Sequence, residues 1–362
     1  MDINLFSKFS DLFELTFPNM GYFSARRYDP RYFAMMLGLL ACAATIVDVE
    51  AQDVARFGFT RHLMGTEVKV VLYAADSTEA ANAAGQAFAR IEELNARLSD
   101  YLIDSEVSRL SKTHGQPIAV GEDLWNVLIT GQEIARASDG AFDVTVGPLT
   151  LLWRKATRRA TLPDAVEITN ASAMVGYRFL VLDADSRTVQ LNRENMRLDL
   201  GGIAKGYAAD EALKILTKAG IASAAVDAGG DIALGNAPIG ADGWSVEVFD
   251  LDVEGNLGTE ELTLANCGIA VSGDTYRYLE HDGVKYSHII NPHTGYGVEH
   301  ERKVAVVAPS AMIADAWASA YSVMVWESAI LDADNQANLS TRFVERRESG
   351  LQETNTGQFR RE

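Results

Sequence analysis

Lys205 and the glycines around it form a segment whose composition suits the binding of an anion. In DLGGIAKGYAAD, residues 199–210, they stand where an apolar-alternating run passes into a helical run. Glycine lets a backbone approach a ligand closely, because it carries no Cβ. The amides of a helix's first turn attract anions, Lys205 adds a charge suited to phosphate, and Asp199 can accept from a ribose or a base. A glycine-rich packing turn with a surface lysine would give the same composition.

Asp315 and Ser319 are four residues apart in ADAWASA, residues 314–320. On a helix this spacing presents the carboxylate and the hydroxyl on one face. Hard oxygen ligands of this kind suit Mg²⁺, which usually takes few protein ligands and completes its shell with phosphate and water. The alternative is that Asp315 only complements the dipole at the start of a helix.

His288 and Phe142 stand in two turns that suit catalysis and ring binding. His288 follows an alternating run and precedes NPHTG, and catalytic groups are often displayed at such turns. A histidine there can accept the proton of an attacking hydroxyl, although a turn histidine more commonly hydrogen-bonds to the backbone. In GAFD, residues 140–143, Phe142 can stack on a flat ring and Asp143 can accept from it. The plainer interpretation is a core phenylalanine beside an aspartate that caps a strand.

The elements that would position these residues alternate irregularly along the chain. The run RFGFTRHLMGTEVKVVLYAAD predicts a strand pair with Gly65 at the bend. Ser77 is the predicted N-cap of the following helix, and further helices are predicted at residues 124–140, 207–218 and 313–326. Short strand-like runs lie between them, many in antiparallel-looking pairs. This arrangement favours an α+β fold over a doubly wound sheet, and the glycine run lacks the spacing of a dinucleotide fingerprint.

The composition fits a folded, soluble protein and argues against a nucleic-acid binder. The chain has 362 residues, of which 48% are hydrophobic, and its formal net charge is −18. This length is enough for one large domain or two modest ones, and nucleic-acid binders show a basic face that such acidity contradicts. A nucleotide ligand therefore requires local cations, backbone amides or a metal. With only Cys42 and Cys267, the chain has neither a disulfide framework nor a cysteine zinc site.

Residues 1–51 are predicted to be an N-terminal extension and secretory signal, and residues 52–362 the functional domain. Arginines precede YFAMMLGLLACAATIV, an apolar run that is too short for a comfortable membrane span. Cleavage after Ala51 would release a soluble protein, whereas a lipobox LLAC would make Cys42 a lipidated N-terminus at the inner membrane. An uncleaved membrane anchor is a third interpretation. The segment thus predicts export to the periplasm.

Seven motifs, in their order along the chain, resemble those of the ApbE family, the FAD:protein FMN transferases or flavin transferases. The resemblance covers nearly the whole chain after the signal. The motifs are HLMGTEVKV at 62–70, SDYLIDSEVSRLS at 99–111, SDGAFDVTVGPLTLLW at 138–153, LDLGGIAKGYAAD at 198–210, VDAGGDI at 226–232, VSGD with HIINPHTG within 271–295, and ADAWASA at 314–320. The resemblance implies an ApbE-like mixed α/β fold in a single lobe, with largely antiparallel sheets and packed helices.

The resemblance also implies roles for individual residues. His288 matches the position implicated in catalysis. Mg²⁺ would be held by Asp315, Ser319 and the backbone carbonyl of Gly202. The positions that match FAD-binding residues of the family are Met64, Tyr101, Ala141, Phe142, Asp143, Asp199, Lys205 and Ile289. In this interpretation the glycines let the backbone reach the metal and the FAD phosphates, while Lys205 faces the nucleotide.

Several positions depart from the family pattern without removing a metal ligand or His288. Ser319 stands where the family usually has threonine, and it keeps the hydroxyl. The other departures are Val271, Asn291, His293 and Val298. Asn291 and Val271 bear on the fine positioning of the flavin.

The implied reaction is Mg²⁺-dependent phosphoryl transfer. A Thr or Ser hydroxyl of a partner flavoprotein attacks the FMN-side phosphorus of FAD, AMP leaves, and FMN stays attached by a phosphoester. Family partners include membrane redox subunits and regulators of respiratory reductases. Two alternatives stay open from the sequence: an FAD pyrophosphatase that gives FMN and AMP, and a periplasmic flavin-binding protein without turnover.

Overall fold

The computed structural model describes residues 54–252, 254–273 and 278–360. They belong to the unit Asp53–Glu362, which the contacts within the chain separate from Met1–Gln52. The predicted signal in residues 1–51, with Cys42, lies outside the described residues. Among the residues that are described, no helix is both long enough and apolar enough to cross a bilayer.

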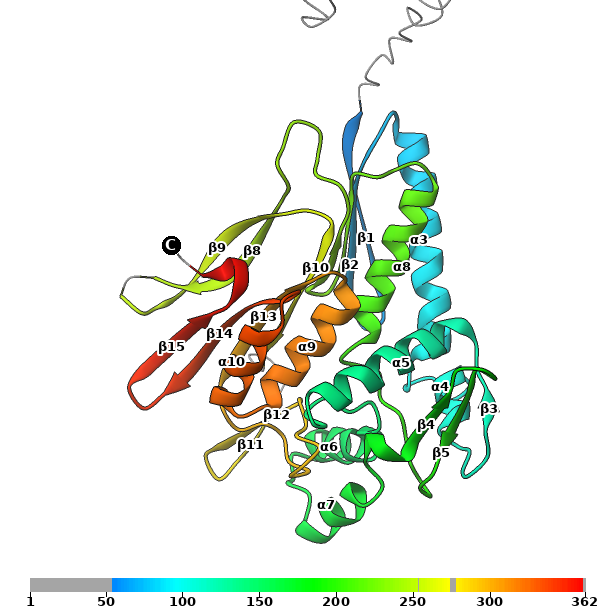
Figure 1. The fold of residues 1–362 in the computed structure, drawn as a ribbon, viewed down its shortest axis with the longest axis vertical. Helices are drawn as coiled ribbons and strands as arrows, with labels where there is room; N and C mark the ends of the chain where they lie inside the picture. Colours follow the sequence, from blue (N-terminus) through cyan, green and yellow to red (C-terminus); the bar gives the residue numbers. More distant parts are fainter. Residues whose placement is uncertain (1–53, 253, 274–277, 361–362) are drawn as a thin grey trace, which may run out of the picture. The chain divides into compact units, whose positions relative to one another are not determined.

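An eight-stranded sheet runs through this unit (Figure 1). Each pair of neighbouring strands in it is antiparallel. Val68, Val70 and Leu72 are fully buried, because alternate residues of a strand face the same side. These features confirm the predicted α+β class. In spatial order the strands are β1 (Ala55–Leu63), β2 (Thr66–Ala74), β6 (Ala224–Ala228), β7 (Asp231–Leu234), β10 (Cys267–Gly273), β13 (Arg302–Ala308), β14 (Ser340–Arg347) and β15 (Gly350–Asn355).

Three helices, α3 (Ser77–Leu98), α8 (Ala204–Lys218) and α9 (Ala311–Val323), pack along one face of the sheet (Figure 1). Their apolar sides and the inner residues of the sheet enclose the largest apolar core, in which Ile91 and Ala212 are completely buried. The hairpin of β8 (Trp244–Leu251) and β9 (Leu257–Leu264) contributes a second core with side chains from the same sheet. The sheet is therefore packed on both faces, which gives the helices a rigid base.

All four predicted helices begin earlier in the chain than expected. The helices predicted at 124–140 and 313–326 span Glu122–Ala137 and Ala311–Val323, and the other two starts have identifiable causes or consequences. The N-cap of α3 is Asp76 and not Ser77, because the Asp76 carboxylate accepts from the amides of Thr78 at 2.7 Å and Glu79 at 2.9 Å. A carboxylate there also complements the positive end of the helix dipole. Helix α8 begins at Ala204 rather than Tyr207, so that Lys205 lies inside its first turn.

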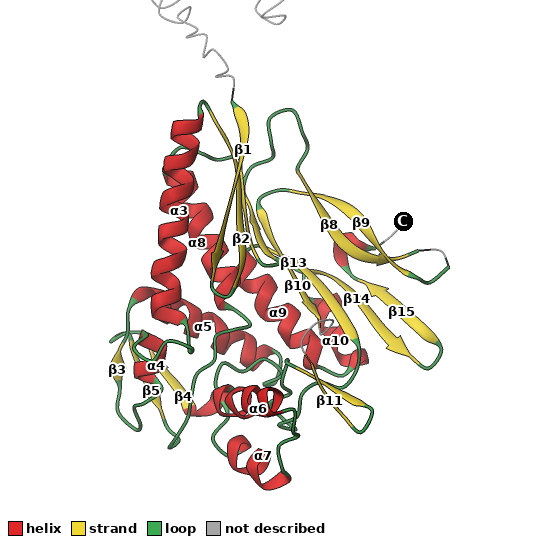
Figure 2. Ribbon diagram, turned by 180° about the vertical axis from the view of Figure 1, so that it is seen from behind, coloured by secondary structure: helices red, strands yellow, loops and turns green. Residues whose placement is uncertain are grey.

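Most of the remaining elements gather at one end of the sheet (Figure 2), whereas α10 (Trp326–Asn335) lies beside α9 and packs in the main core. The helices α6 (Gly147–Arg159) and α7 (Ala165–Ser172) share a third apolar core with the hairpin of β11 (Tyr278–His281) and β12 (Val284–Ser287). The other elements at this end are α4 (Glu106–Leu110), β3 (Ile118–Ala119), α5 (Glu122–Ala137), β4 (Leu180–Asp183) and β5 (Thr188–Leu191).

The start of α9 is held by very close backbone contacts. Ala311 lies against two glycines: a Cβ on Gly206 of α8 would be 2.2 Å from its carbonyl oxygen, and a Cβ on Gly268 of β10 would be 2.1 Å from its amide nitrogen. The carboxylate of Asp210 accepts from the amides of Ala311 and Met312, each at 2.9 Å. These contacts fix the helix that carries Asp315 and Ser319.

Gly268→Ala is therefore expected to lower the free energy of unfolding by about 3 kcal/mol, since the new Cβ meets immobile backbone on α9. Gly58→Ala in β1 is the matched control, because nothing lies within 4 Å of a Cβ there. The control should raise stability by about 0.5–1 kcal/mol, the usual gain when alanine replaces a strand glycine. Urea unfolding of both variants measures the difference. Equal stabilities would contradict the close packing of α9.

Candidate functional site

The turn between β1 and β2 places Met64 beside another turn of the sheet. Met64 and Gly65 both have positive φ, 51° and 73°, as the two central residues of a type I′ hairpin turn require. A Cβ on Gly229 would be 2.3 Å from Thr66 Oγ1. The Met64 turn therefore lies against the Gly229–Gly230 turn, which leads directly into Asp231.

Lys205 lies between two buried carboxylates. Its ammonium group donates a short hydrogen bond to Asp231 and is 3.6 Å from Asp315 Oδ2. The amide of Gly206 also donates to Asp315, at 3.2 Å. Asp231 and Asp315 are 3% and 5% exposed, so this cluster holds two buried carboxylates beside the half-buried side chain of Lys205. The position of Lys205 differs from the expectation that it faces a nucleotide directly, because its charge is directed to these two acids.

The electrostatics of this cluster show an excess of negative charge. Burial and the neighbouring Asp315 raise the pKa of Asp231 to about 7, although Lys205 opposes the rise. Burial likewise raises the pKa of Asp315. Burial alone would lower the pKa of Lys205, but the two carboxylates outweigh it and raise that pKa above its ordinary value. The single ammonium group of Lys205 does not neutralise the charge of both carboxylates. A bound cation would stabilise the ionised form of both acids.

The three residues predicted to hold Mg²⁺ come together next to this cluster. Asp315 and Ser319 share one face of α9, and a Cβ on Gly202 would be 2.8 Å from Ser319 Oγ. The backbone of Gly202 thus approaches the Ser319 hydroxyl more closely than any larger residue would allow. Carboxylate, hydroxyl and carbonyl are all hard oxygen donors. The residues present therefore fit a hard divalent cation.

Among the described residues, no three His, Cys, Asp or Glu side chains come together in a group that could hold a metal ion. The predicted set contains only one such side chain, Asp315. The identity of a metal therefore depends on the donors described above and stays a prediction.

A second cluster surrounds Tyr101 and Asp199. Asp199 is 8% exposed, and its carboxylate accepts from the Gly201 amide at 2.8 Å, Thr150 Oγ1 at 2.7 Å and Arg154 Nη2 at 2.7 Å. Tyr101 is 74% exposed, and the guanidinium carbon of Arg154 lies 4.2 Å from the centre of its ring. Because Gly201 immediately precedes Gly202, the backbone connects this cluster to the predicted metal ligands.

The turn Ala141–Asp143 lies close to Gly202, one of the predicted metal ligands, and to the loop that carries His288. The ring of Phe142 would be 3.4 Å from a Cβ on Gly202. Ala141 packs in one apolar cluster with Val298, and Ile289 packs against it. The carboxylate of Asp143 accepts from the Thr145 amide and hydroxyl and from the Tyr177 amide, at 2.7–2.8 Å. Its oxygens are thus used within the protein, in line with the alternative that it supports the local backbone.

His288 follows β12 on a loop. The backbone of this loop is held by hydrogen bonds, and the side chain of His288 is exposed. Val298 forms backbone hydrogen bonds with the residues on both sides of His288. The Val298 carbonyl accepts from the Ser287 amide at 2.8 Å, and the Val298 amide donates to the Ile289 carbonyl at 2.9 Å. Trp153 of α6 anchors the same loop by donating to the Gly295 carbonyl at 2.8 Å. An exposed imidazole on a fixed backbone suits a proton acceptor for an incoming group.

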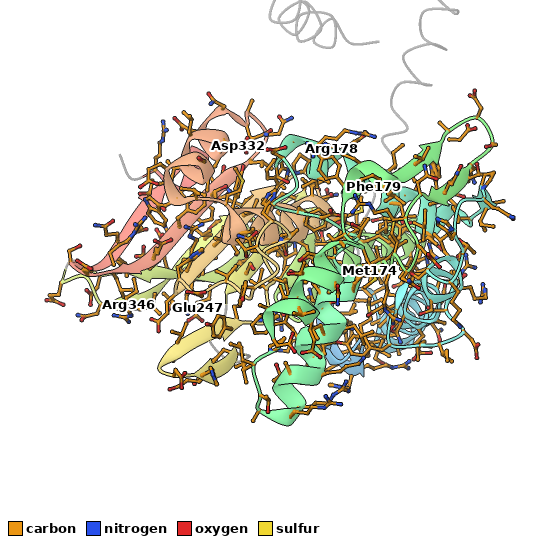
Figure 3. All side chains as sticks on the ribbon, turned by 90° about the horizontal axis from the view of Figure 1, so that it is seen from below. Met174, Arg178, Phe179, Glu247, Asp332 and Arg346 are labelled. Atoms are coloured by element: carbon orange, nitrogen blue, oxygen red, sulfur yellow. The ribbon has the colours of Figure 1, made fainter. Side chains whose placement is uncertain are left out.

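Two surface hollows lie apart from most of these residues. The first, of about 800 Å³, is lined by side chains that include Ser108, Leu152 and Met174, and by none of the predicted site residues. The second is lined by residues that include Asp143, Arg178 and Phe179. Met174, Arg178 and Phe179 are labelled in Figure 3. Neither hollow carries the chemistry of the two clusters above.

Residues 64–341 match the model of the ApbE family. The chain belongs to the ApbE family. Among similar proteins, one from Treponema pallidum (strain Nichols) named FAD:protein FMN transferase is 32% identical over 281 residues, which cover 73% of this chain and 78% of that protein. A Haemophilus influenzae protein of the same name is 28% identical over 279 residues, which cover 75% and 80%.

Solved ApbE structures share the fold. The structure described as flavin transferase ApbE from Vibrio cholerae superimposes with a TM-score of 0.75 at 27% identity, and the match covers 84% of this chain and 98% of that chain. The ApbE protein of Thermotoga maritima gives a TM-score of 0.73 at 28% identity. The ApbE-like fold predicted from the motifs is thereby confirmed.

Asp231 and Arg154 were missed as site residues by the sequence reasoning. The ApbE motif VDAGGDI contains Asp231, so the signal was present, but nothing in the motif says that this acid meets Lys205. Arg154 follows the motif that ends in LLW and carries no pattern of its own. Its partners Asp100 and Asp199 are 54 and 45 residues away in the chain, and only the fold brings them together.

Proposed function

We propose that this chain is an FAD:protein FMN transferase, which moves FMN from FAD to a Thr or Ser hydroxyl of a partner flavoprotein and releases AMP. Membership of the ApbE family and the names of its relatives support the flavin transfer. The observation that carries the proposal for this chain is the meeting of Gly202, Asp315 and Ser319 beside Lys205. These residues place oxygen donors that suit a cation next to a glycine-rich backbone at the start of a helix.

Gly202, Asp315 and Ser319 are the residues that would hold Mg²⁺. When bound, Mg²⁺ supplies the positive charge that neutralises a pyrophosphate in an acidic protein. Lys205 would keep Asp231 and Asp315 in position, because both acids contact its ammonium group. Two amides at the start of α8 are already used within the protein, because Ala204 donates to the Leu200 carbonyl at 2.8 Å and Gly206 donates to Asp315 at 3.2 Å. The exposed ring of Tyr101 offers a surface for a flat ligand, whereas Phe142 is buried in the main apolar core.

The proposed step forms one bond and breaks another at the FMN-side phosphorus. The oxygen of the acceptor hydroxyl bonds to this phosphorus, and the bond from phosphorus to the bridging oxygen of the pyrophosphate breaks. AMP leaves with the bridging oxygen, and the hydroxyl proton passes to the imidazole of His288. Such transfers depend on positioning and charge neutralisation more than on covalent help from the enzyme.

Incubating the protein with FAD and Mg²⁺, with and without a purified flavoprotein acceptor, separates the candidate functions. We expect saturable quenching of flavin fluorescence on FAD binding, and AMP release that requires the acceptor hydroxyl. AMP release at the same rate without acceptor would instead identify an FAD pyrophosphatase. Saturable FAD binding without any AMP release would identify a flavin-binding protein, and no saturable binding would exclude all three.

We also propose that the mature protein acts on the periplasmic side, because residues 26–51 have the composition of an export signal. Cell fractionation should recover the shortened chain outside the cytoplasm. If Cys42 is the processing site, Cys42→Ala should abolish incorporation of labelled lipid. Lipid label that persists in the Cys42→Ala variant would exclude the lipobox, and a full-length chain confined to the cytoplasm would exclude export.

A further inference from the structure

Arg154 of α6 contacts the two groups of the second cluster at the same time. Its guanidinium lies over the ring of Tyr101, 4.2 Å from the ring centre. Its Nη1 donates to Asp100 Oδ2 at 2.5 Å, and its Nη2 donates to Asp199 Oδ2 at 2.7 Å. One planar group therefore joins an exposed aromatic ring to two buried carboxylates, in a geometry that suits arginine and not lysine.

The ring of Tyr101 is supported on one face and open on the other. The side chain is 74% exposed although Arg154 covers part of it. An exposed tyrosine without such support would lose rotamer freedom on binding a ligand. The guanidinium reduces that loss, because cation–π attraction already holds the ring. The open face is then a prepared surface for a flat aromatic ligand.

Asp199 is fixed from the same helix. Thr150 and Arg154 are one turn apart on α6, so that both reach Asp199 Oδ2, each at 2.7 Å. Burial and the nearby Asp199 raise the pKa of Asp100, so the two acids repel each other unless a cation separates them. Arg197 lies 3.8 Å from Asp100 Oδ2. Arg154 is the cation that pairs with both acids.

We propose that Arg154 is a positioning residue for the flavin nucleotide. It holds the Tyr101 ring and the Asp199 carboxylate in one arrangement before FAD binds. This inference rests on the proposed function, since it takes FAD as the ligand of Tyr101 and Asp199. Arg154 acts through these two residues, and the reacting phosphorus lies with the other cluster, so its loss should weaken FAD binding and leave the transfer step nearly unchanged.

The test uses Arg154→Lys, because lysine keeps the charge between Asp100 and Asp199 but loses the planar stack on Tyr101. We expect the Kd for FAD and the KM to rise about tenfold, because a flavin nucleotide stacked on Tyr101 would desolvate the cation–π contact that lysine weakens, with kcat changed less than about twofold. Arg158→Lys on the exposed side of α6 is the matched control and should change none of these values. Thermal unfolding should show that both variants are fully folded at the temperature of the binding assay.

A double-mutant cycle with Tyr101→Leu shows whether the effect passes through the ring. In the Tyr101→Leu background, Arg154→Lys should raise the Kd for FAD by clearly less than tenfold. An equal increase in both backgrounds, or no increase in either, would overturn the positioning role. Failure of the wild-type protein to bind FAD would instead refute the proposed function. FAD binding by the wild type, with an unchanged Kd for Arg154→Lys, would refute only this inference.

Discussion

His288→Ala should slow FMN transfer by roughly 10²–10⁴-fold, the usual contribution of a positioned acid–base group, while the Kd for FAD stays near the wild-type value. Its side chain is exposed, and the backbone on both sides is held by Val298. Removing the imidazole therefore leaves the loop in place. Stopped assays of AMP release, together with FAD titration by fluorescence, measure the two quantities separately.

His281→Ala is the control for this prediction. His281 lies at the end of β11, in the hairpin that precedes His288, and its one described ion-pair contact is with the adjacent Asp282, at 3.5 Å. Its loss should leave both the transfer rate and FAD binding unchanged. If His288→Ala transfers FMN at the wild-type rate, the imidazole is a turn residue and another group accepts the proton.

Asp315→Ala should abolish Mg²⁺-dependent turnover, because the carboxylate supplies the charge that would hold the ion. Metal ions contribute several kcal/mol of transition-state stabilisation, so a fall of about 10³-fold or more is expected. The variant should still fold, since Lys205 keeps its bond to Asp231. Activity measured over a Mg²⁺ titration, with circular dichroism as the check on folding, tests this expectation.

Two substitutions at Ser319 distinguish the contribution of its hydroxyl to activity from the contribution of the Asp315 carboxylate. Ser319→Ala should lower activity less than Asp315→Ala, because water replaces a neutral oxygen more easily than a charged one. Ser319→Thr should keep activity, since it retains the hydroxyl and the facing Gly202 carries no side chain. Full Mg²⁺-dependent activity in Asp315→Ala would place the metal elsewhere and contradict the proposed mechanism.

The local elements were largely predictable because their signals are local. The alternation in β2 and the Gly65 bend gave the strand pair, and helical spacing placed Asp315 and Ser319 on one face of α9. The predicted N-cap of α3 was wrong by one residue, since Asp76 and Ser77 are both good N-cap residues and only the geometry distinguishes them. Secondary structure at this level depends on neighbours within one turn.

The charge clusters were not predictable because their partners are distant in the chain. Lys205 was expected to face the nucleotide, but the turn between β6 and β7 brings Asp231 to it from 26 residues away. Arg154 depends in the same way on the path of α6 past Asp199. The assignments of Met64, Asp143 and the other matched positions to FAD stay predictions. Asp143 and Asp199 are the two of them whose carboxylates already accept hydrogen bonds within the protein.

The central claim is that this chain attaches FMN covalently to another protein. The direct measurement is to co-express it with a redox subunit that carries a target threonine, in a host without its own flavin transferase, and to image flavin fluorescence after denaturing electrophoresis. We expect a fluorescent band at the acceptor that disappears when the target threonine is replaced by alanine, or when this chain carries Asp315→Ala. An acceptor that stays dark in the presence of active, FAD-binding enzyme would contradict the claim.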